Sequence, residues 1–486
     1  MQPFRVRSSA DPVVEDRKEE EEDRKDMYYE HSFPYDDVFS FATLHHEDRP
    51  ENREFATTNA NDIWRRYNSA KTPSELRKIV AGAGAGASLH LGPFYNEASH
   101  RARVPGVVPM GKQLPFDLDL TDVAFLGVPK HDQEQNDRYV RLIFAQVHVL
   151  QTVLNVVFGF EHFLPVYSGR RGAHLWVLDE RASALSDEAR KAIATMITPP
   201  NSRSDARVCS RRAILANPTF WDDAIHKALR DARDRVLCAR FSEGGVGMFD
   251  SKTRVDAFLD KFFDASQRSV KSGSAAGAAA GAAVGAAAGA AAGAAPGAPP
   301  SKWRGYELEM EKQVRAAMRG VTGPETLSTL ESVLEARSGV SPTGCPAPGA
   351  GPASKLTPFQ VSCKEALERL HNLEFSLIWP TLDAGPSAQM GHCVKLPFSE
   401  HGSTGRIALP VSRLLPRRGS SLATSLPPVV TADDLRVPGE KNDVFLKSVA
   451  FFRAAVARAR RGATPVPSDD VEDIEDLAAS RKRALE

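Results

Sequence analysis

Residues 114–119 read LPFDLD. Apolar and polar side chains alternate along this stretch, which predicts a β-strand. Residues two positions apart on a strand face the same side, so the carboxylates of Asp117 and Asp119 share one face. Such a pair is suited to hold hard divalent cations such as Mg²⁺. A lone pair of aspartates is, however, more often a solvated or structural feature.

The residues that follow predict a helix and a hairpin. Asn136–Phe158 carries apolar side chains at three- and four-residue steps and is followed by Gly159, which predicts a helix that stops there. Phe163–Tyr167 and Ala173–Leu178 are strand-like runs separated by a short glycine-containing turn. This pattern predicts strand, turn and strand.

Further elements are predicted on both sides of this region. Thr72 precedes a helix-like run and is expected to cap it. Phe359–Leu377 and Asn442–Arg461 are predicted helices, and Arg406–Val411 is a predicted strand. The residues between about 185 and 263 are helical and charged in pattern.

The composition excludes several classes of protein. Of the 486 residues, 62 are Lys or Arg and 62 are Asp or Glu, so a polyanion-binding surface has to be local. The hydrophobic share of 42% is that of a globular protein. Five scattered cysteines indicate a reducing compartment, and the acidic N-terminal region is unlike a signal peptide. We therefore expect an intracellular, soluble protein with no membrane association.

Several segments are expected to lie outside the folded core. Residues 1–26 are a predicted disordered acidic tail, and 463–486 a charged tail. Residues 271–300 repeat Gly every four positions among Ala, which favours a linker over a small-residue helix contact. Residues 341–354 are rich in Pro and Gly and predict a second linker or loop.

Two other stretches carry residues suited to phosphate chemistry. Residues 168–174 read SGRRGAH, in which arginines match phosphate oxygens and glycines allow backbone amides to approach. The alternative is an exposed basic hairpin. Residues 382–406 supply Asp383, which would complete a three-carboxylate metal site, together with basic residues suited to meet a nucleotide.

Taken together, FDLDLTD, YSGRRGAHLWVLDE and the spaced pattern LD…H..K.PFS.H..TGRI closely resemble the catalytic small subunit of archaeal and eukaryotic DNA primases, nearer the eukaryotic form. The resemblance covers about residues 27–180 and 375–460, and REF at 53–55 and DIWRRY at 62–67 extend it. It implies an α+β fold with a mixed-sheet catalytic core. That core would comprise residues 27–180 and 375–462, with a helical subdomain inserted at 181–374, and would carry the three aspartates on neighbouring strands.

The resemblance also implies a role for each candidate residue. Asp117, Asp119 and Asp383 would hold the metal, with Glu54, Asp117 and Asp119 catalytic. The implied nucleotide-binding residues are Arg66, Ser168, Gly169, Arg170, Arg171, Gly172, His174, His392, Cys393, Val394, Lys395 and His401.

The implied activity is template-directed synthesis of short RNA primers for DNA replication by two-metal nucleotidyl transfer, with Mg²⁺ or Mn²⁺. The implied partners are a primase large subunit, a DNA polymerase alpha-type complex, single-stranded DNA template and ribonucleoside triphosphates, and the implied location is the nucleus. The alternatives are a primase-polymerase or repair polymerase on the same fold, and a catalytically silent scaffold for the large subunit.

The chain departs from the family pattern at four places. Residues 123–139 lack the cysteines of a zinc knuckle, so we expect a plain loop and no zinc there. His90 stands where relatives often place an acidic residue near the sugar, and Gln113 stands in place of Glu. Residues 382–387 read LDAGPS, which glycine and proline loosen.

Overall fold

The structure is a computed structural model. It describes residues 27–59, 63–83, 87–123, 133–198, 211–237, 249, 251–260, 262–263, 304–322, 325–338, 356–402, 404–415, 429–436 and 438–462. The two predicted tails and the two predicted linkers lie outside these residues. So does most of the predicted zinc-free loop, at 124–132.

The first sheet is built mainly from the N-terminal part of the chain. Its strands are β1 (Arg53–Thr58), β2 (Trp64–Asn68), β3 (Ser88–Tyr95) and β4 (Pro109–Gly111), in the order β2-β1-β3-β4. The short strand β8 (Val394–Lys395) pairs with β3 as well. A segment from the C-terminal part of the chain is therefore joined to the N-terminal sheet.

The second sheet contains the LPFDLD stretch. Its order is β5-β7-β6-β9, from β5 (Leu114–Asp119), β6 (Phe163–Tyr167), β7 (Gly172–Val177) and β9 (Leu409–Pro410). The predicted strand at 114–119 and the predicted hairpin are both confirmed. The predicted strand Arg406–Val411 is shorter than expected, because Pro410 has no N–H to donate and lies in the edge strand β9.

The prediction of one mixed sheet was wrong. The described strands form two sheets, and each of their pairings is antiparallel. Asp383 was also wrongly expected on a strand. It instead precedes the short helix α13 (Ala384–Ala388), and its carboxylate accepts a hydrogen bond from the Gly385 N–H. Gly and Pro in LDAGPS favour this capped turn over an extended strand.

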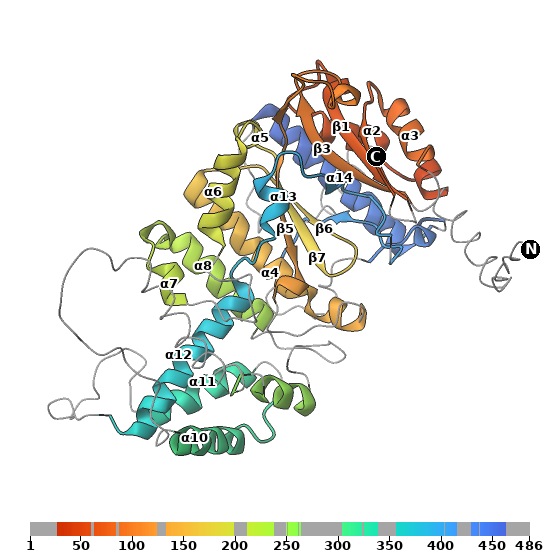
Figure 1. The fold of residues 1–486 in the computed structure, drawn as a ribbon. Coiled ribbons are helices and arrows are strands. Elements are labelled where there is room, and N and C mark those ends of the chain that lie inside the picture. Colours follow the sequence, from red (N-terminus) through yellow and green to blue (C-terminus); the bar gives the residue numbers. More distant parts are fainter. Residues whose placement is uncertain are drawn as a thin grey trace, which may run out of the picture.

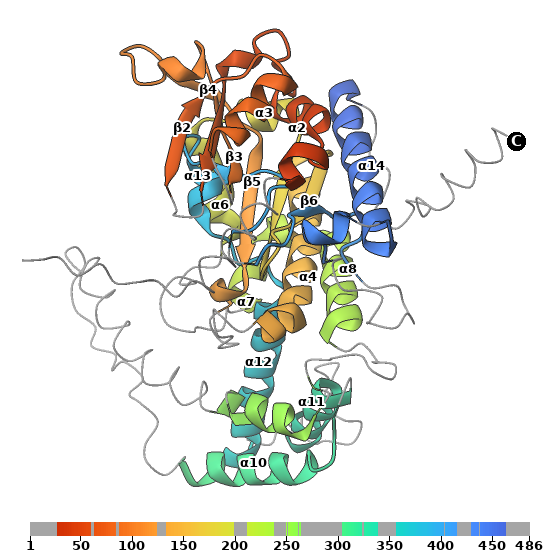
Figure 2. The same ribbon diagram turned by 90° about the vertical axis from the view of Figure 1, so that its right-hand side faces the viewer.

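Helices cover the two sheets on several sides (Figures 1 and 2). The predicted helix Asn136–Phe158 is confirmed as α4 (Gln133–Phe158), and Gly159 follows with φ +67°. The predicted helices Phe359–Leu377 and Asn442–Arg461 correspond to α12 (Pro358–Ile378) and α14 (Glu440–Arg461), and Thr72 caps α3 (Pro73–Ala81) as expected. The structure also describes α2 (Tyr35–Ala42), α5 (Glu180–Ser183), α6 (Asp187–Ile197), α7 (Arg211–Leu215), α8 (Asp223–Ala232), α10 (Arg304–Ala317) and α11 (Glu325–Ser338).

Helix α4 is apolar enough over Tyr139–Phe158 to cross a membrane by length and composition. Two thirds of that stretch, 67%, is buried inside the protein, which is typical of a core helix. Its side chains join those of β5 and β7 and those of α8, α10, α11 and α12 in one continuous hydrophobic core. The long helix α12 leads from the sheets to α10 and α11 at the far end of the molecule (Figure 1).

A second hydrophobic core lies on the other side of the strands. It contains side chains from α2, α3 and α14 and from the first sheet and β6. Because β6 contributes to this core while β5 and β7 contribute mainly to the first, the second sheet separates the two cores. The candidate residues described below lie where the two sheets meet.

Candidate active site

Asp117, Asp119 and Asp383 lie near one another at the end of β5. Asp117 lies opposite His174 in the β5–β7 pairing, and Asp119 lies opposite Gly172. Asp383 forms an isolated antiparallel bridge with Asp117, in which the Asp383 N–H donates to the Asp117 carbonyl at 3.0 Å. The fold therefore attaches the carboxylate from the C-terminal part of the chain directly to the strand that carries the other two.

These carboxylates repel one another. Burial raises the pKa of Asp117 to about 7, and the negative charges of Asp119 and Asp383 contribute to that rise. Burial and the same neighbours raise the pKa of Asp122 to about 6. An excess of carboxylate charge in a partly buried position is the arrangement that a bound cation stabilises.

Asp119 has strong partners of its own. The Arg171 Nε atom donates to both of its carboxylate oxygens, at 2.7 and 2.9 Å, and Thr121 donates through N–H and hydroxyl. Within the part of the chain that the structure describes, no three His, Cys, Asp or Glu side chains are gathered as a metal-binding group. The donor set nevertheless fits Mg²⁺ or Mn²⁺, because it consists of carboxylate oxygens whose mutual repulsion a divalent cation would relieve.

His174 lies beside this group without adding charge. Its Nε2 atom is 3.6 Å from a carboxylate oxygen of Asp117. Burial lowers the pKa of His174 to about 3, and the charge of Lys395 contributes to that lowering. The imidazole is therefore neutral at pH 7 and is suited to hydrogen bonding rather than to charge compensation.

The turn at 168–172 is tightly folded and packs on a second loop. The Ser168 N–H donates to the Gly172 carbonyl at 3.0 Å, and Gly169 has φ +90°. The Thr404 hydroxyl donates to the Gly169 carbonyl at 3.0 Å. A Cβ on Gly169 would lie 2.9 Å from the carbonyl oxygen of Arg406. The predicted phosphate-binding turn and the 401–406 loop therefore form one unit.

Positive charge gathers at this unit. Burial lowers the pKa of His401 to about 3, and the cations Lys395, Arg170 and Arg171 contribute to that lowering. Burial also lowers the pKa of Lys395 to about 8. Three cations close enough to influence one imidazole create a local positive potential. Because the whole chain carries no net charge, a site for a polyanion depends on a local concentration of cations of this kind.

Strand β8 places Lys395 beside the first sheet. Lys395 lies opposite His90 and Val394 opposite Leu91. The Val394 side chain is buried in the second core, so it faces away from solvent. His90 also contacts Trp64, which is 50% exposed, with the two ring centroids 4.5 Å apart.

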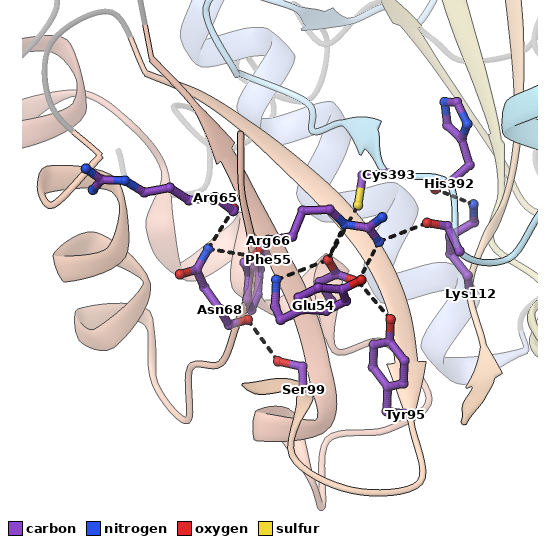
Figure 3. Close-up of polar contacts among 12 residues, drawn as sticks. Glu54, Phe55, Arg65, Arg66, Asn68, Tyr95, Ser99, Lys112, His392 and Cys393 are labelled. Carbon is purple, nitrogen blue, oxygen red and sulfur yellow. Dashed lines mark hydrogen bonds and ion pairs between the residues drawn. The ribbon is translucent and has the colours of Figure 1, made fainter. Parts of the chain in front are cut away.

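Glu54 belongs to a separate network on the first sheet (Figure 3). Its carboxylate is fully buried and accepts hydrogen bonds from the Arg66 guanidinium at 2.8 and 3.0 Å. The Tyr67 N–H and the Tyr95 hydroxyl also donate to it, at 3.1 Å each. A Cβ on Gly92 would lie 2.6 Å from this carboxylate, so only glycine leaves room for it there.

The 391–393 segment links this network to the rest of the site. Arg66 donates through Nη2 to the Gly391 carbonyl at 2.9 Å, and the Cys393 thiol lies 3.7 Å from Glu54 (Figure 3). Burial and the Glu54 charge raise the pKa of Cys393 to about 12, so Cys393 remains a thiol. His392 is exposed, and its carbonyl oxygen accepts a hydrogen bond from Lys112 at 2.8 Å.

The structure thus brings the predicted residues together in three neighbouring groups: the aspartates with His174, the 168–172 turn with His401, and Glu54 with Arg66 and Cys393. Asp122, Thr404 and Lys112 were not among the residues predicted from the sequence. Asp122 had a weak signal, since it follows the aspartate pair in FDLDLTD. A single lysine before a strand carries no signal, and the role of Lys112 depends on a backbone carbonyl 280 positions away.

Known proteins share sequence with most of this chain. A family model described as DNA primase small subunit matches residues 116–413 of the chain. The DNA primase small subunit of Schizosaccharomyces pombe is 33% identical over 400 residues, which cover 79% of this chain and 72% of the relative.

More distant relatives carry the same description. The DNA primase small subunit of Saccharomyces cerevisiae is 27% identical over 195 residues, or 38% of this chain. The DNA primase small subunit of Drosophila melanogaster is 29% identical over 177 residues, or 36% of this chain. In these two alignments the chain spans 47% and 40% of the relative's length.

Proposed function

The chain belongs to the DNA primase small subunit family, the nucleotidyltransferases that synthesise RNA primers, and we propose that it extends primers by metal-assisted nucleotidyl transfer at the end of β5. The observation that carries the proposal is the bridge between Asp383 and Asp117. It joins the backbones of two aspartates from distant parts of the chain, beside a third aspartate and next to a positively charged turn.

Asp117, Asp119 and Asp383 would hold Mg²⁺ or Mn²⁺, in keeping with the divalent-metal use that the family implies. A divalent cation bound there would supply Lewis-acid chemistry to the transfer of the α-phosphate to the primer 3′-oxygen, with release of pyrophosphate, and would neutralise the charge that develops. The role of the protein in this proposal is to orient the carboxylates. The β5–β7 pairing orients Asp117 and Asp119, and the backbone bridge orients Asp383.

The triphosphate would lie against the 168–172 turn. Arg170, Arg171 and Lys395 offer charge there, and neutral His174 and His401 offer hydrogen bonds. Gly169 and Gly172 carry no side chain, which lets the turn pack against the Arg406 and Leu118 carbonyls and holds Arg170 and Arg171 in place between them. Glu54 would act indirectly, because its carboxylate holds Arg66 and through it the 391–393 segment.

The wider assignments are part of the same proposal. The template would be single-stranded DNA and the substrates ribonucleoside triphosphates. The partners would be a primase large subunit and a DNA polymerase alpha-type complex in the nucleus, since the relatives are eukaryotic primase subunits. No zinc is proposed for this chain.

Primer synthesis on a single-stranded pyrimidine template, with labelled ATP and Mg²⁺ or Mn²⁺, tests the proposal. Wild type is compared with Asp117→Asn, and with Asp37→Asn as a control that changes a part-buried aspartate paired with exposed Arg453, away from the candidate site. Loss of a metal carboxylate removes several kcal/mol of transition-state stabilisation, so Asp117→Asn should lower the rate at least about 100-fold. The control should retain wild-type activity.

The assay is run with and without a candidate large subunit, because initiation can belong to the complex. Equal activity of Asp117→Asn and wild type would refute the carboxylate assignment. No product from folded wild type under any condition would favour a catalytically silent scaffold.

A further inference from the structure

The loop between Asp383 and Val394 directs several backbone carbonyls toward one point. It begins with the short helix α13, whose C-terminal carbonyls have no partners further along a helix. The carbonyl oxygens of Pro386, Gln389 and His392 converge on the same side of the loop. Carbonyls at a helix C-terminus carry partial negative charge and favour a nearby cation.

The ammonium group of Lys112 occupies that point. Its Nζ atom donates to Pro386 at 3.4 Å, to Gln389 at 3.0 Å and to His392 at 2.8 Å, and the last contact is drawn in Figure 3. The side chain is fully buried, and burial lowers the pKa of Lys112 to about 7. The three donors of an ammonium are matched to three carbonyls.

Two further contacts hold the same loop. The Met390 N–H donates to the carboxylate of Asp187 at 2.8 Å, at the start of α6. Arg66 donates to the Gly391 carbonyl from the first sheet. Lys112 itself lies just before β5, and its N–H donates to the Ser183 carbonyl at 3.0 Å. The loop is thus tied to the strand that carries the aspartates, to α6 and to the Glu54 network.

The position of this loop matters because both of its ends are in the candidate site. Asp383 precedes it, and His392 and Lys395 lie at or just beyond its end. Asp383 has its own attachment to β5 through the backbone bridge, which does not involve Lys112. Losing the Lys112 contacts should therefore loosen the nucleotide-binding end of the loop more than the carboxylate end.

We propose that Lys112 is a positioning residue, which holds the 384–392 loop so that His392 and Lys395 are in place before the nucleoside triphosphate binds. This inference rests on the proposed function, because it deepens the account of that site. Without the ammonium, the incoming nucleotide has to order the loop itself, and the cost is taken from its binding free energy.

Steady-state kinetics on the full chain test the proposal with two substitutions of graded effect. Lys112→Gln keeps two donors and Lys112→Met keeps none. The KM for ATP should rise in the order wild type, Gln, Met, reaching about tenfold for Met, while kcat changes less. Asp187→Ala removes the exposed anchor on the other side of the loop and should raise KM in the same direction.

The matched control is Lys441→Gln. Lys441 is on α14, and the substitution removes its ammonium from an ion pair with Asp434. It should leave KM and kcat unchanged. Melting temperatures show that each variant is folded. If Lys112→Met does not fold, Lys112→Gln and Asp187→Ala carry the test.

Amide hydrogen exchange separates failure of this inference from failure of the proposed function. Faster exchange at residues 389–392 in Lys112→Gln, with a raised KM, supports the inference. Unchanged exchange and KM in folded Lys112 variants, or a fall in kcat at constant KM, would overturn it. Wild type that makes no primer would refute the proposed function instead, and the exchange result would still show whether Lys112 holds the loop.

Discussion

At the scale of single residues, the candidate site combines groups whose charge is determined by burial. His90 and His174 are buried and His401 is half-buried, each near Lys395 or other cations, and the pKa of each is lowered to about 3. These imidazoles stay neutral at physiological pH. The positive charge that would meet a triphosphate at the proposed site therefore comes from arginine and lysine side chains, of which only lysine titrates in the accessible pH range.

Lys395 should make nucleotide binding depend on pH. Burial lowers its pKa to about 8, although Asp117 and Glu400 favour its charged form. Lys395 is therefore protonated at pH 7 and loses its charge as the pH rises through about 8. The KM for ATP should increase between about pH 7.5 and 9.5 in wild type, measured by initial rates.

Lys395→Arg is the control for this effect, because guanidinium keeps its charge throughout that range. Its KM should change little over the same interval. An identical rise in both proteins would show that another group controls the pH dependence.

At the scale of elements, the site depends on contacts between turns rather than on long strands. The 168–172 turn packs on the 401–406 loop through Thr404, and the Arg406 guanidinium donates to the Tyr167 hydroxyl at 3.3 Å. Strand β8 has two residues and β9 has two. Strands this short are held in place mainly by contacts with neighbouring segments. A steric clash in the 168–172 turn should therefore displace the 401–406 loop.

Gly169 allows this coupling to be tested. It has φ +90°, and a Cβ there would meet the Arg406 carbonyl at 2.9 Å and the His401 Cβ at 3.2 Å. Gly106 has nearly the same backbone angle, φ +88°, but a Cβ on Gly106 would have no neighbour within 4 Å. The pair separates backbone strain from crowding.

Gly169→Ala and Gly106→Ala should each lose about 1 kcal/mol of stability from the strained backbone, measured by denaturant unfolding. Only Gly169→Ala should also raise the KM for ATP, because it pushes the 401–406 loop away from the turn. Equal KM values for the two variants would contradict the idea that the two turns act as one unit.

At the scale of the whole molecule, the N-terminal aromatic segment closes over the C-terminal part of the site. The Tyr28 hydroxyl donates to the Phe398 carbonyl at 2.8 Å, and the Glu400 N–H donates to the Tyr29 hydroxyl at 3.0 Å. Phe398 has φ +65°, a conformation that non-glycine residues adopt rarely and that surrounding contacts have to stabilise. Residues 370 positions apart therefore hold one another.

Tyr29→Phe tests this long-range contact. The substitution leaves the buried Glu400 N–H without its acceptor, which should cost about 1–3 kcal/mol of unfolding free energy. Tyr306→Phe is the control, because Tyr306 is 43% exposed on α10 and substitutions at the surface usually change stability little. Guanidinium unfolding measures both, and equal losses of stability would contradict the structural role of Tyr29.

Hydrophobic periodicity and turn residues predicted those helices and strands whose conformation depends mainly on their own sequence. The strand at 114–119, the hairpin, α4, α12 and α14 follow from periodicity and from stop signals such as Gly159. The turn SGRRG was predicted for the same reason, since its glycines permit a backbone that other residues resist. The mixed sheet was predicted wrongly because strand direction depends on partners that periodicity does not identify.

The candidate residues were named from their chemical types and from the family resemblance, but the contacts between them could not be predicted. Nothing local indicates that Asp383 bridges to Asp117, or that Arg171 holds Asp119. The same is true of Gly92, whose lack of a side chain makes room for Glu54, and of Lys112, whose carbonyl partners lie far along the chain.

Neighbouring residues and motifs were therefore enough to predict α3, α4, α12 and α14, the strands of the second sheet, the family, and the chemical kinds of side chain at the candidate site, but none of the strands of the first sheet. They were not enough to show that there are two antiparallel sheets, that β8 joins the first of them, or that the Lys112 ammonium holds the 384–392 loop. Those features came from the folded chain alone, because they depend on which separate segments of the chain hydrogen-bond to one another. Packing of the whole chain determines which of these residues meet, and no single segment encodes it.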